Sequence, residues 1–314
     1  MNPQNGLSCY SANLAMYLLP HRSDALDVVA RSVRLAVRPG EEPAFSHHSV
    51  PLHQLRPGGE LGYAAAGTGA DAIEALAGEV NRNGQVLVLT GRAVLPWSVP
   101  EPGHGAPHLL LVDSHSGSRW HVVDEFSALR PAGRQDPYTG WITDEELLKA
   151  MEPNPAPAAE HKLRNEHAFG FPVPLPPDGT YQWLAFQPSR TTGSDLPDEW
   201  LTGIDEVFEA LTEFWSGLDG NPDRRRFLED MWACSQHHTY RYNWLVTSQD
   251  ADPEAFTDAI AAWQNLPMAL RFAADSADRG RARPSMVRTT FDQLRAADGP
   301  ARELLPEYGY PGTH

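Results

Sequence analysis

The chain has little cysteine, few basic residues and no long apolar run. Its 314 residues include only two cysteines, Cys9 and Cys234, which excludes a disulfide framework and a cysteine-rich zinc site. No apolar stretch approaches the roughly 20 residues of a membrane-spanning helix. The N-terminus has no basic region followed by an apolar stretch and a small-residue cleavage site, so we expect no secretory signal. The sequence thus predicts a protein of the reducing cytoplasm that has no membrane partner.

Negative charge is in excess: 41 acidic residues face 25 Lys and Arg, for a net charge of −16. A surface of this sign disfavours nucleic acid as a partner, because binding to phosphates needs positive charge. It would attract a cationic small molecule instead. Two basic clusters stand out, "RRR" at 224–226 and "RGRAR" at 279–283. They are interpreted as solvated helix ends, or alternatively as a local docking site for an acidic carrier protein or a phosphopantetheine phosphate.

Hydrophobic periodicity predicts an α+β fold in the first half of the chain and helices in the second. Helices are expected at 8–19, from Ser23, at 70–82 and, from the capping box of Thr143 and Glu146, at 143–151. Strands are expected at 85–90, 108–112, 120–124 and 180–188, and residues 38–66 read as irregular. Beyond residue 195 the pattern indicates about four helices. We therefore expect a domain at 1–152, a linker and sheet-completing strand at 153–195, and a helical domain at 196–314.

Cys9 lies where the segment "GLSCYSANL" begins to read as a helix. Ser8 is the expected N-cap, and the helix dipole at the first turn favours a thiolate. The backbone amides of Cys9 and Tyr10 would point toward a developing oxyanion. The side-chain amide of Gln4, or that of Asn5, could donate to the same oxygen. These features make Cys9 a candidate nucleophile, although a lone cysteine is more often an inert core residue.

His108 and Asp124 are the expected partners of Cys9. They lie at the outer ends of the two strands of the predicted hairpin, so an Asp–His pair could form there and orient the imidazole. The alternatives are His104, His115 and His121 for the histidine, and Asp113 and Glu125 for the carboxylate. A Cys-His-Asp triad of this kind supports acyl transfer through a thioester.

The segments "QNGLSCYSANLAMYL" and "HLLLVDSHSGSRWHVVDEF" resemble the papain-like fold, and more closely the N-terminal domain family of the butirosin biosynthesis protein H. The tail with "AIAAWQNLPMAL" is similar to the helical domain that usually follows in that family. The resemblance implies a central antiparallel sheet with a nucleophile helix, and a cysteine acyltransferase of antibiotic biosynthesis. It further implies an acyl carrier protein as donor and an amine as acceptor, an aminoglycoside in the butirosin enzyme. No cofactor is implied beyond the donor's phosphopantetheine. The nearest counterpart of the expected glycine-rich segment is "GYAAAGTG", with Tyr63.

Several histidines outside this triad are expected to line the substrate site. They are His47 and His48 in "HHSVPLH", His104 in the loop before His108, and His238 in "MWACSQHHTYRY", together with Tyr63. The spacing of His47, His48 and His53 suits no common zinc site, so no metal is expected. Cys234 with His237 and His238 could form a second dyad, but core packing is the preferred interpretation. Tyr240 or Tyr242 could border the cleft.

The sequence is also compatible with two other functions. A papain-like peptidase or amidase would use the same residues, with water in place of the amine. A catalytically inert binding protein on the same fold would leave Cys9 unreactive. The aromatic-rich helices could bury a homodimer interface or a domain contact.

Overall fold

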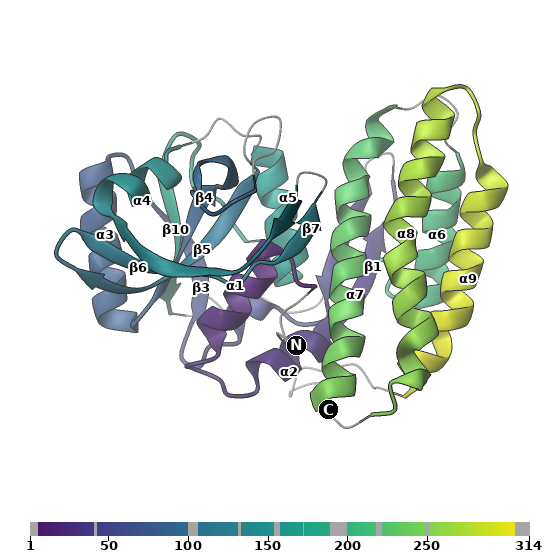
Figure 1. The fold of residues 1–314 in the computed structure, drawn as a ribbon, viewed down its shortest axis with the longest axis horizontal. Helices are drawn as coiled ribbons and strands as arrows, with labels where there is room; N and C mark the ends of the chain where they lie inside the picture. The colour runs from purple at the N-terminus through teal and green to yellow at the C-terminus, as the bar shows by residue number, and fades with distance from the viewer. Residues whose placement is uncertain are drawn as a thin grey trace. The chain divides into compact units, whose positions relative to one another are not determined.

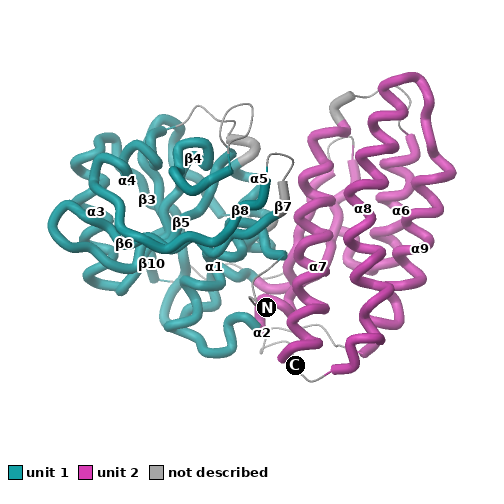
Figure 2. Tube along the Cα trace, in the orientation of Figure 1, with its two compact units in different colours: residues 1–26, 51–193 teal, residues 27–50, 194–314 magenta. Residues whose placement is uncertain are grey.

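The computed structural model describes residues 6–40, 43–99, 106–130, 133–153, 158–171, 173–188, 200–217, 222–248 and 251–304. The fold is α+β, as the sequence predicts. The chain forms two compact units, coloured separately in Figure 2. Unit 1 comprises residues 1–26 and 51–193, and unit 2 comprises residues 27–50 and 194–314. The segment 27–50 thus groups with the helical unit, whereas the sequence predicts it within the first domain. Residues 153–193, expected to be a linker and a strand, group with unit 1.

Unit 1 is built on a six-stranded antiparallel sheet in the order β3-β10-β4-β5-β6-β9 (Figure 1). Its strands are β3 (Glu60–Ala66), β4 (Val86–Gly91), β5 (Pro107–Ser116), β6 (Arg119–Asp124), β9 (Tyr138–Thr143) and β10 (Tyr181–Gln187). A small ribbon of β7 (Ala128–Arg130) and β8 (Gly133–Gln135) follows β6. Because β4, β5 and β6 lie inside the sheet, side chains at their ends are held by backbone pairing on both sides.

The helices of unit 1 surround this sheet. They are α1 (Cys9–Leu18), α3 (Gly69–Asn83), α4 (Asp144–Ala150) and α5 (Ala158–Phe169), with short 3-10 turns η1 (Leu52–Gln54) and η2 (Arg92–Val94). A core of alternate strand residues such as Leu110 and Val112 receives Leu76 of α3 and Leu147 of α4. Helix α1 packs against β4, β5, β6 and α5. Nearly every side chain of α1 is buried, as expected for a helix in the middle of a domain.

The predicted hairpin is present, but its strands are longer than expected. Residues 113–116, expected to belong to the connection, continue β5, and only Gly117 and Ser118 form the turn. Gly117 takes φ +61°, which a tight two-residue turn requires. The pairing register shifts between Val112 and Ser114. This irregularity absorbs a residue of β5, an effect that composition does not reveal.

Other expectations differ from the structure in two places. Residues 38–66, expected to be irregular, contain the end of β1 (Val33–Arg38), β2 (Ala44–His48) and β3. Helix α5 occupies part of the expected linker at 153–195. Both segments have mixed polar and apolar residues whose burial comes from tertiary packing rather than from local periodicity.

Unit 2 is a helical assembly that includes the antiparallel β1–β2 hairpin. Its four long helices are α6 (Ile204–Ser216), α7 (Leu228–Ser248), α8 (Glu254–Asp278) and α9 (Pro284–Glu303), with η3 (Pro222–Phe227) before α7; α2 (Ala25–Ser32) precedes β1. The hairpin residues Leu35, Val37 and Phe45 join the core of these helices. The expectation of about four helices beyond residue 195 is met in the described residues. None of the described helices is both long enough and apolar enough to cross a bilayer.

Candidate active site

Cys9 is the first residue of α1, and its neighbours make it a well-defined helix start. Ser8 is the N-cap, because its hydroxyl accepts a hydrogen bond from Ser11 N at 3.2 Å. The Cys9 side chain is buried, with 5% of its surface exposed. Amides of a first helical turn have no carbonyl partner inside the helix. Cys9 N–H therefore lies beside its own sulfur as a donor suited to an oxyanion.

His108 lies near the start of β5, where the sheet fixes its backbone. It pairs with Thr90 of β4, whose hydroxyl donates to the His108 carbonyl at 2.9 Å. The imidazole is buried, and the Phe126 ring packs on it edge to face at 5.8 Å between centroids. The backbone pairing with β4 and the packing of the Phe126 ring thus hold the imidazole in one orientation.

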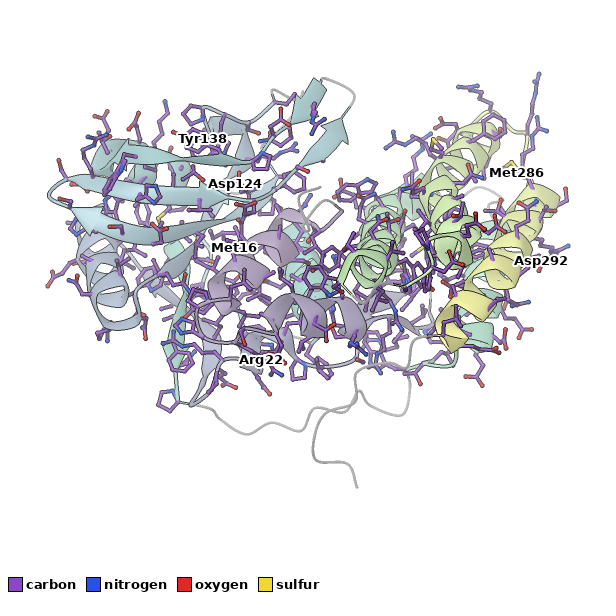
Figure 3. The ribbon with its side chains drawn as sticks, turned by 60° about the horizontal axis from the view of Figure 1, so that its bottom comes forward. Met16, Arg22, Asp124, Tyr138, Met286 and Asp292 are labelled. Atoms are coloured by element: carbon purple, nitrogen blue, oxygen red, sulfur yellow. The ribbon has the colours of Figure 1, made fainter. Side chains whose placement is uncertain are left out.

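Asp124 ends β6 and brings a buried carboxylate to His108. His108 Nε2 lies 3.0 Å from Asp124 Oδ2, and both side chains are 1% exposed. The same oxygen accepts from Trp97 Nε1 at 2.9 Å, and Oδ1 accepts from Asn13 Nδ2 at 3.1 Å and from Phe126 N at 3.2 Å. Four donors hold the carboxylate ionised inside the protein. Figure 3 labels Asp124 and, on the paired strand β9, Tyr138.

The charges of these three groups depend on one another. Burial raises the pKa of the Cys9 thiol, but the attraction and hydrogen bond of His108, with a further contribution from Arg164, outweigh it and leave the pKa below its ordinary value. Burial lowers the pKa of His108, and Asp124 and Cys9 together raise it to about 10. The pKa of Asp124 is raised by burial and lowered more strongly by His108, Trp97 and Asn13. The site therefore favours the thiolate of Cys9 more than an ordinary cysteine environment does, beside an imidazolium and a carboxylate.

The geometry also assigns the two ring nitrogens of His108. Nε2 is at the carboxylate, so Nδ1 is the nitrogen left to exchange a proton with Cys9. Apart from the hydrogen bond between the ring and the Cys9 thiol, Nδ1 has no hydrogen-bond partner among the described residues.

Asn13 joins α1 to the β5–β6 hairpin and was not singled out from the sequence. Its Nδ2 donates to the Leu109 carbonyl at 2.7 Å as well as to Asp124, and its Oδ1 accepts from Glu125 N at 3.0 Å. It lies four residues after Cys9, so both side chains share one face of α1. In the sequence, the signal for this role was an asparagine four residues after the cysteine. Trp97 lies in a loop, stacked on Tyr138 at 4.0 Å, and no sequence pattern indicated its contact with Asp124.

Replacement of Asn13 by Ala is expected to lower the free energy of unfolding by about 1–3 kcal/mol, because it removes the hydrogen bonds that Asn13 makes to Asp124, to the Leu109 carbonyl and to Glu125 N–H. Denaturant unfolding measures this difference. The control is Asn81→Ala, an exposed position on α3 that should change the stability by less than about 0.5 kcal/mol. Equal stability of the two variants would contradict a clamping role for Asn13.

A second polar cluster lies close to Cys9, because Tyr10, the next residue, takes part in it. The Tyr10 hydroxyl is 2.7 Å from His161 Nδ1 on α5, and the edge of the Tyr63 ring meets the His161 ring at 5.2 Å between centroids. The Tyr63 hydroxyl donates to Asn165 Oδ1 at 2.6 Å. Tyr63, expected to contact substrate, thus supports His161, which sequence reasoning missed. The side chain of Tyr10 is committed to His161, while its amide belongs to the first turn of α1.

The rival residues in the described part of the chain have other partners. His121 Nδ1 lies 2.6 Å from Asp113 Oδ1, and His115 packs on Trp120 at 4.1 Å between centroids. Both pairs belong to the turn end of the β5–β6 hairpin, whereas His108 lies near the other end of β5. Gln4, Asn5 and His104 lie outside the described residues.

His47, His48 and His238, expected to line a substrate site, are buried in unit 2. The rings of His47 and His48 lie 5.3 and 5.1 Å from that of His237, and His238 stacks on Trp263 at 3.9 Å. Exclusion from water lowers the pKa of His238 and raises that of Cys234, so both side chains are neutral. Among the described residues, no group of three or more His, Cys, Asp or Glu is arranged to hold a metal ion. The expectation of core packing around Cys234 agrees with its complete burial.

The basic clusters make contacts within unit 2. Arg225 pairs with Asp275 and, at 2.7 Å, with Asp278. Arg226 lies over the Phe227 ring at 4.7 Å, and Arg283 over the Phe272 ring at 5.8 Å. Of these arginines, Arg225 is thus paired with two carboxylates of unit 2.

Unit 1 therefore brings together a buried cysteine at a helix start, a histidine and a carboxylate that accepts a hydrogen bond from that histidine, which are groups that thioester chemistry can use. No protein-family model matches this chain, and no curated protein sequence matches it either.

Proposed function

We propose that this protein is a cysteine-dependent acyltransferase that forms a thioester on Cys9 and passes the acyl group to an amine. The observation that carries the proposal is the buried Cys9–His108–Asp124 arrangement, in which the imidazolium of His108 stabilises the Cys9 thiolate. A structural core cysteine has no need of such a partner. Cys234, buried without one, has a raised pKa.

The first half-reaction transfers the acyl group to sulfur. The Cys9 thiolate attacks the carbonyl carbon of an acyl thioester, and the oxyanion of the tetrahedral intermediate accepts a hydrogen bond from the Cys9 amide. Collapse of the intermediate breaks the bond to the donor sulfur, which leaves as a thiol after taking the proton from His108 Nδ1. The acyl-Cys9 thioester and a neutral His108 remain, with Asp124 holding Nε2.

The second half-reaction restores the starting state. A neutral amine attacks the acyl-Cys9 carbonyl, and His108 Nδ1 takes the proton that the amine nitrogen loses. The Cys9 thiolate leaves as the amide forms, so the thiolate–imidazolium pair is regenerated. An acyl carrier protein with its phosphopantetheine thioester is the donor that we propose, in line with the resemblance to the butirosin family. A papain-like hydrolase would differ only in using water.

Incubation with the N-acetylcysteamine thioester of a short fatty acid is expected to add one acyl mass to the protein. The adduct should map to Cys9, because Cys9 alone combines a helix-start position with a charged histidine. Intact-protein mass spectrometry measures it. Cys234→Ala should acylate normally and Cys9→Ser should not.

Absence of an adduct in both the wild-type protein and Cys234→Ala would overturn the proposal. The fate of the adduct separates the two enzyme classes. An acyl-Cys9 that persists in buffer and is discharged by added amine supports transfer. Rapid loss in buffer alone would identify a hydrolase.

A further inference from the structure

Two hydrogen-bond donors share one oxygen of the Asp124 carboxylate. His108 Nε2 lies 3.0 Å from Asp124 Oδ2, and Trp97 Nε1 donates to the same oxygen at 2.9 Å. Asp124 is 1% exposed, so both contacts form away from bulk water, where charges and dipoles interact more strongly. The two half-reactions proposed above use the contact with His108 and give the Trp97 indole no role.

Trp97 lies in the loop after η2, and contacts with two other elements fix its position. Its ring is stacked on Tyr138 of β9, with 4.0 Å between the centroids and 6° between the planes. Tyr138 is also the residue that pairs with Asp124 across β6 and β9. Gln135 of β8 binds the loop, since its Oε1 accepts from Val99 N at 2.9 Å and its Nε2 is directed at the Trp97 carbonyl at 3.4 Å. The indole N–H is therefore held against Asp124 in advance of any substrate.

The indole N–H and the imidazolium compete for the negative charge of the carboxylate. The N–H dipole points its positive end at Asp124 Oδ2, beside the positive charge of His108. Asp124 therefore stabilises the imidazolium less than it would with His108 as the only donor to that oxygen. Asn13 acts differently, because its Nδ2 donates to the other oxygen, Oδ1, and leaves Oδ2 to His108 and Trp97.

The strength of His108 as an acid decides how readily its proton leaves. Burial lowers the pKa of His108, and Asp124 of β6 and Cys9 of α1 together raise it to about 10. Arg164 of α5 acts in turn on the thiol of Cys9. A general acid works best when its pKa lies near the working pH, and the pKa of His108 is already far above neutrality. A group that weakens the attraction of Asp124 for the imidazolium therefore assists proton transfer.

We infer that Trp97 is a positioning residue of the proposed reaction: by sharing Asp124 Oδ2, its indole N–H keeps His108 acidic enough to give its Nδ1 proton to the leaving thiol. This inference rests on the proposed acyl transfer and adds a residue that acts on the chemistry through Asp124. The same hydrogen bond stabilises the ionised carboxylate, so Asp124 remains an acceptor for His108 Nε2 throughout the cycle.

Replacement of Trp97 alone by β-(3-benzothienyl)alanine tests the inference. This analogue has a sulfur atom in place of the indole N–H and nearly the same shape, so it keeps the stack on Tyr138 and loses the donor. Acylation of Cys9 by the N-acetylcysteamine thioester should become about threefold to tenfold slower, because His108 is then a weaker acid. Alkylation of Cys9 by iodoacetamide at pH 6.5 needs no proton from His108 and should be unchanged or faster. The control is the same analogue in place of Trp141, an exposed residue of β9, which should change neither rate.

The NMR signal of the proton on His108 Nε2 provides a readout that does not depend on acylation. In protein labelled with ¹⁵N-histidine, this signal should move downfield in the Trp97 analogue, because the hydrogen bond to Asp124 becomes stronger. His108→Gln identifies the signal. Equal slowing of alkylation and acylation would show a merely structural role for Trp97 and overturn the inference, as would an Nε2 proton signal that does not move. If the wild-type protein is not acylated at all, the proposed function fails, and the NMR signal still decides whether Trp97 acts on His108.

Discussion

In a Cys234→Ala background, His108→Gln is expected to slow the alkylation of Cys9 by iodoacetamide at pH 6.5 by about tenfold or more. The attraction and hydrogen bond of His108 oppose the effect of burial on the Cys9 pKa, and they are lost in the variant. Burial then dominates and moves the pKa above the ordinary thiol value of about 8.5, so that at pH 6.5 about 1% or less of the thiol is ionised. The alkylation rate against pH measures the shift. Acylation by a thioester should fall by about 10²–10⁴-fold.

The matched control for this experiment is His121→Gln. His121 is also paired with an aspartate, Asp113, but at the turn end of the β5–β6 hairpin and partly exposed. Its replacement should leave the alkylation profile of Cys9 unchanged. A wild-type midpoint near 8.5 that His108→Gln does not move would show that Cys9 is an ordinary thiol, and would remove the basis of both enzyme hypotheses.

Asp124→Asn is expected to have the largest effect on stability, about 3–5 kcal/mol. An asparagine has one carbonyl oxygen, whereas the two oxygens of Asp124 accept from His108 and Trp97 on one side and from Asn13 and Phe126 N on the other. Its NH₂ group must therefore face one pair of donors. The imidazolium of His108 also loses its carboxylate, so its pKa falls and proton transfer to the leaving thiol becomes less effective.

Denaturant unfolding and acylation kinetics measure these two effects. Asp113→Asn is the control, since it makes the same substitution in the half-exposed pair with His121 and should cost about 0–1 kcal/mol. Equal losses in the two variants would mean that the buried pair contributes no more than a surface pair.

The stability of the wild-type protein should also depend on pH in a defined way. The raised pKa of His108 stabilises the fold fully below its unfolded value of about 6.5, and this contribution is lost as the pH rises toward about 10. The lowered pKa of Cys9 acts oppositely and contributes above about 8.5. Below about pH 8.5 the two slopes oppose each other wherever both groups titrate, and stability declines above that pH, where only the His108 contribution is still being lost. Asp124→Asn should remove much of the alkaline decline, because it lowers the pKa of His108.

The sequence was most informative where local rules govern structure. A serine before Cys9, the capping box of Thr143 and Glu146, and two apolar runs around a turn predicted α1, α4 and the β5–β6 hairpin. The hairpin in turn led to His108 and Asp124 as partners. That choice did not depend on the length of the connection, which is shorter than expected.

Other parts depend on tertiary packing and could not be predicted from the same rules. The histidines of "HHSVPLH" at 47 and 48 are buried by α7, far along the sequence, and nothing in their spacing shows this. The partners of Asp124 come from α1 and from the Trp97 loop, so the amide of Asn13 acquires its role only when the helix meets the hairpin. His161 belongs to a segment whose composition is that of a linker.

The division of the chain into two interleaved units has a consequence for its synthesis. The β1–β2 hairpin belongs to unit 2, yet the helices that bury its Leu35, Val37 and Phe45 follow residue 194. At about 5–20 residues per second, a ribosome needs roughly 7–30 s to make the intervening segment, and unit 1 can complete its sheet in that interval. The nascent hairpin meanwhile presents apolar side chains and open strand edges to chaperones and to other chains. If the gene were divided at one point between residues 50 and 194, one product would contain the β1–β2 hairpin without the helices that bury it. The other product would contain those helices without the hairpin.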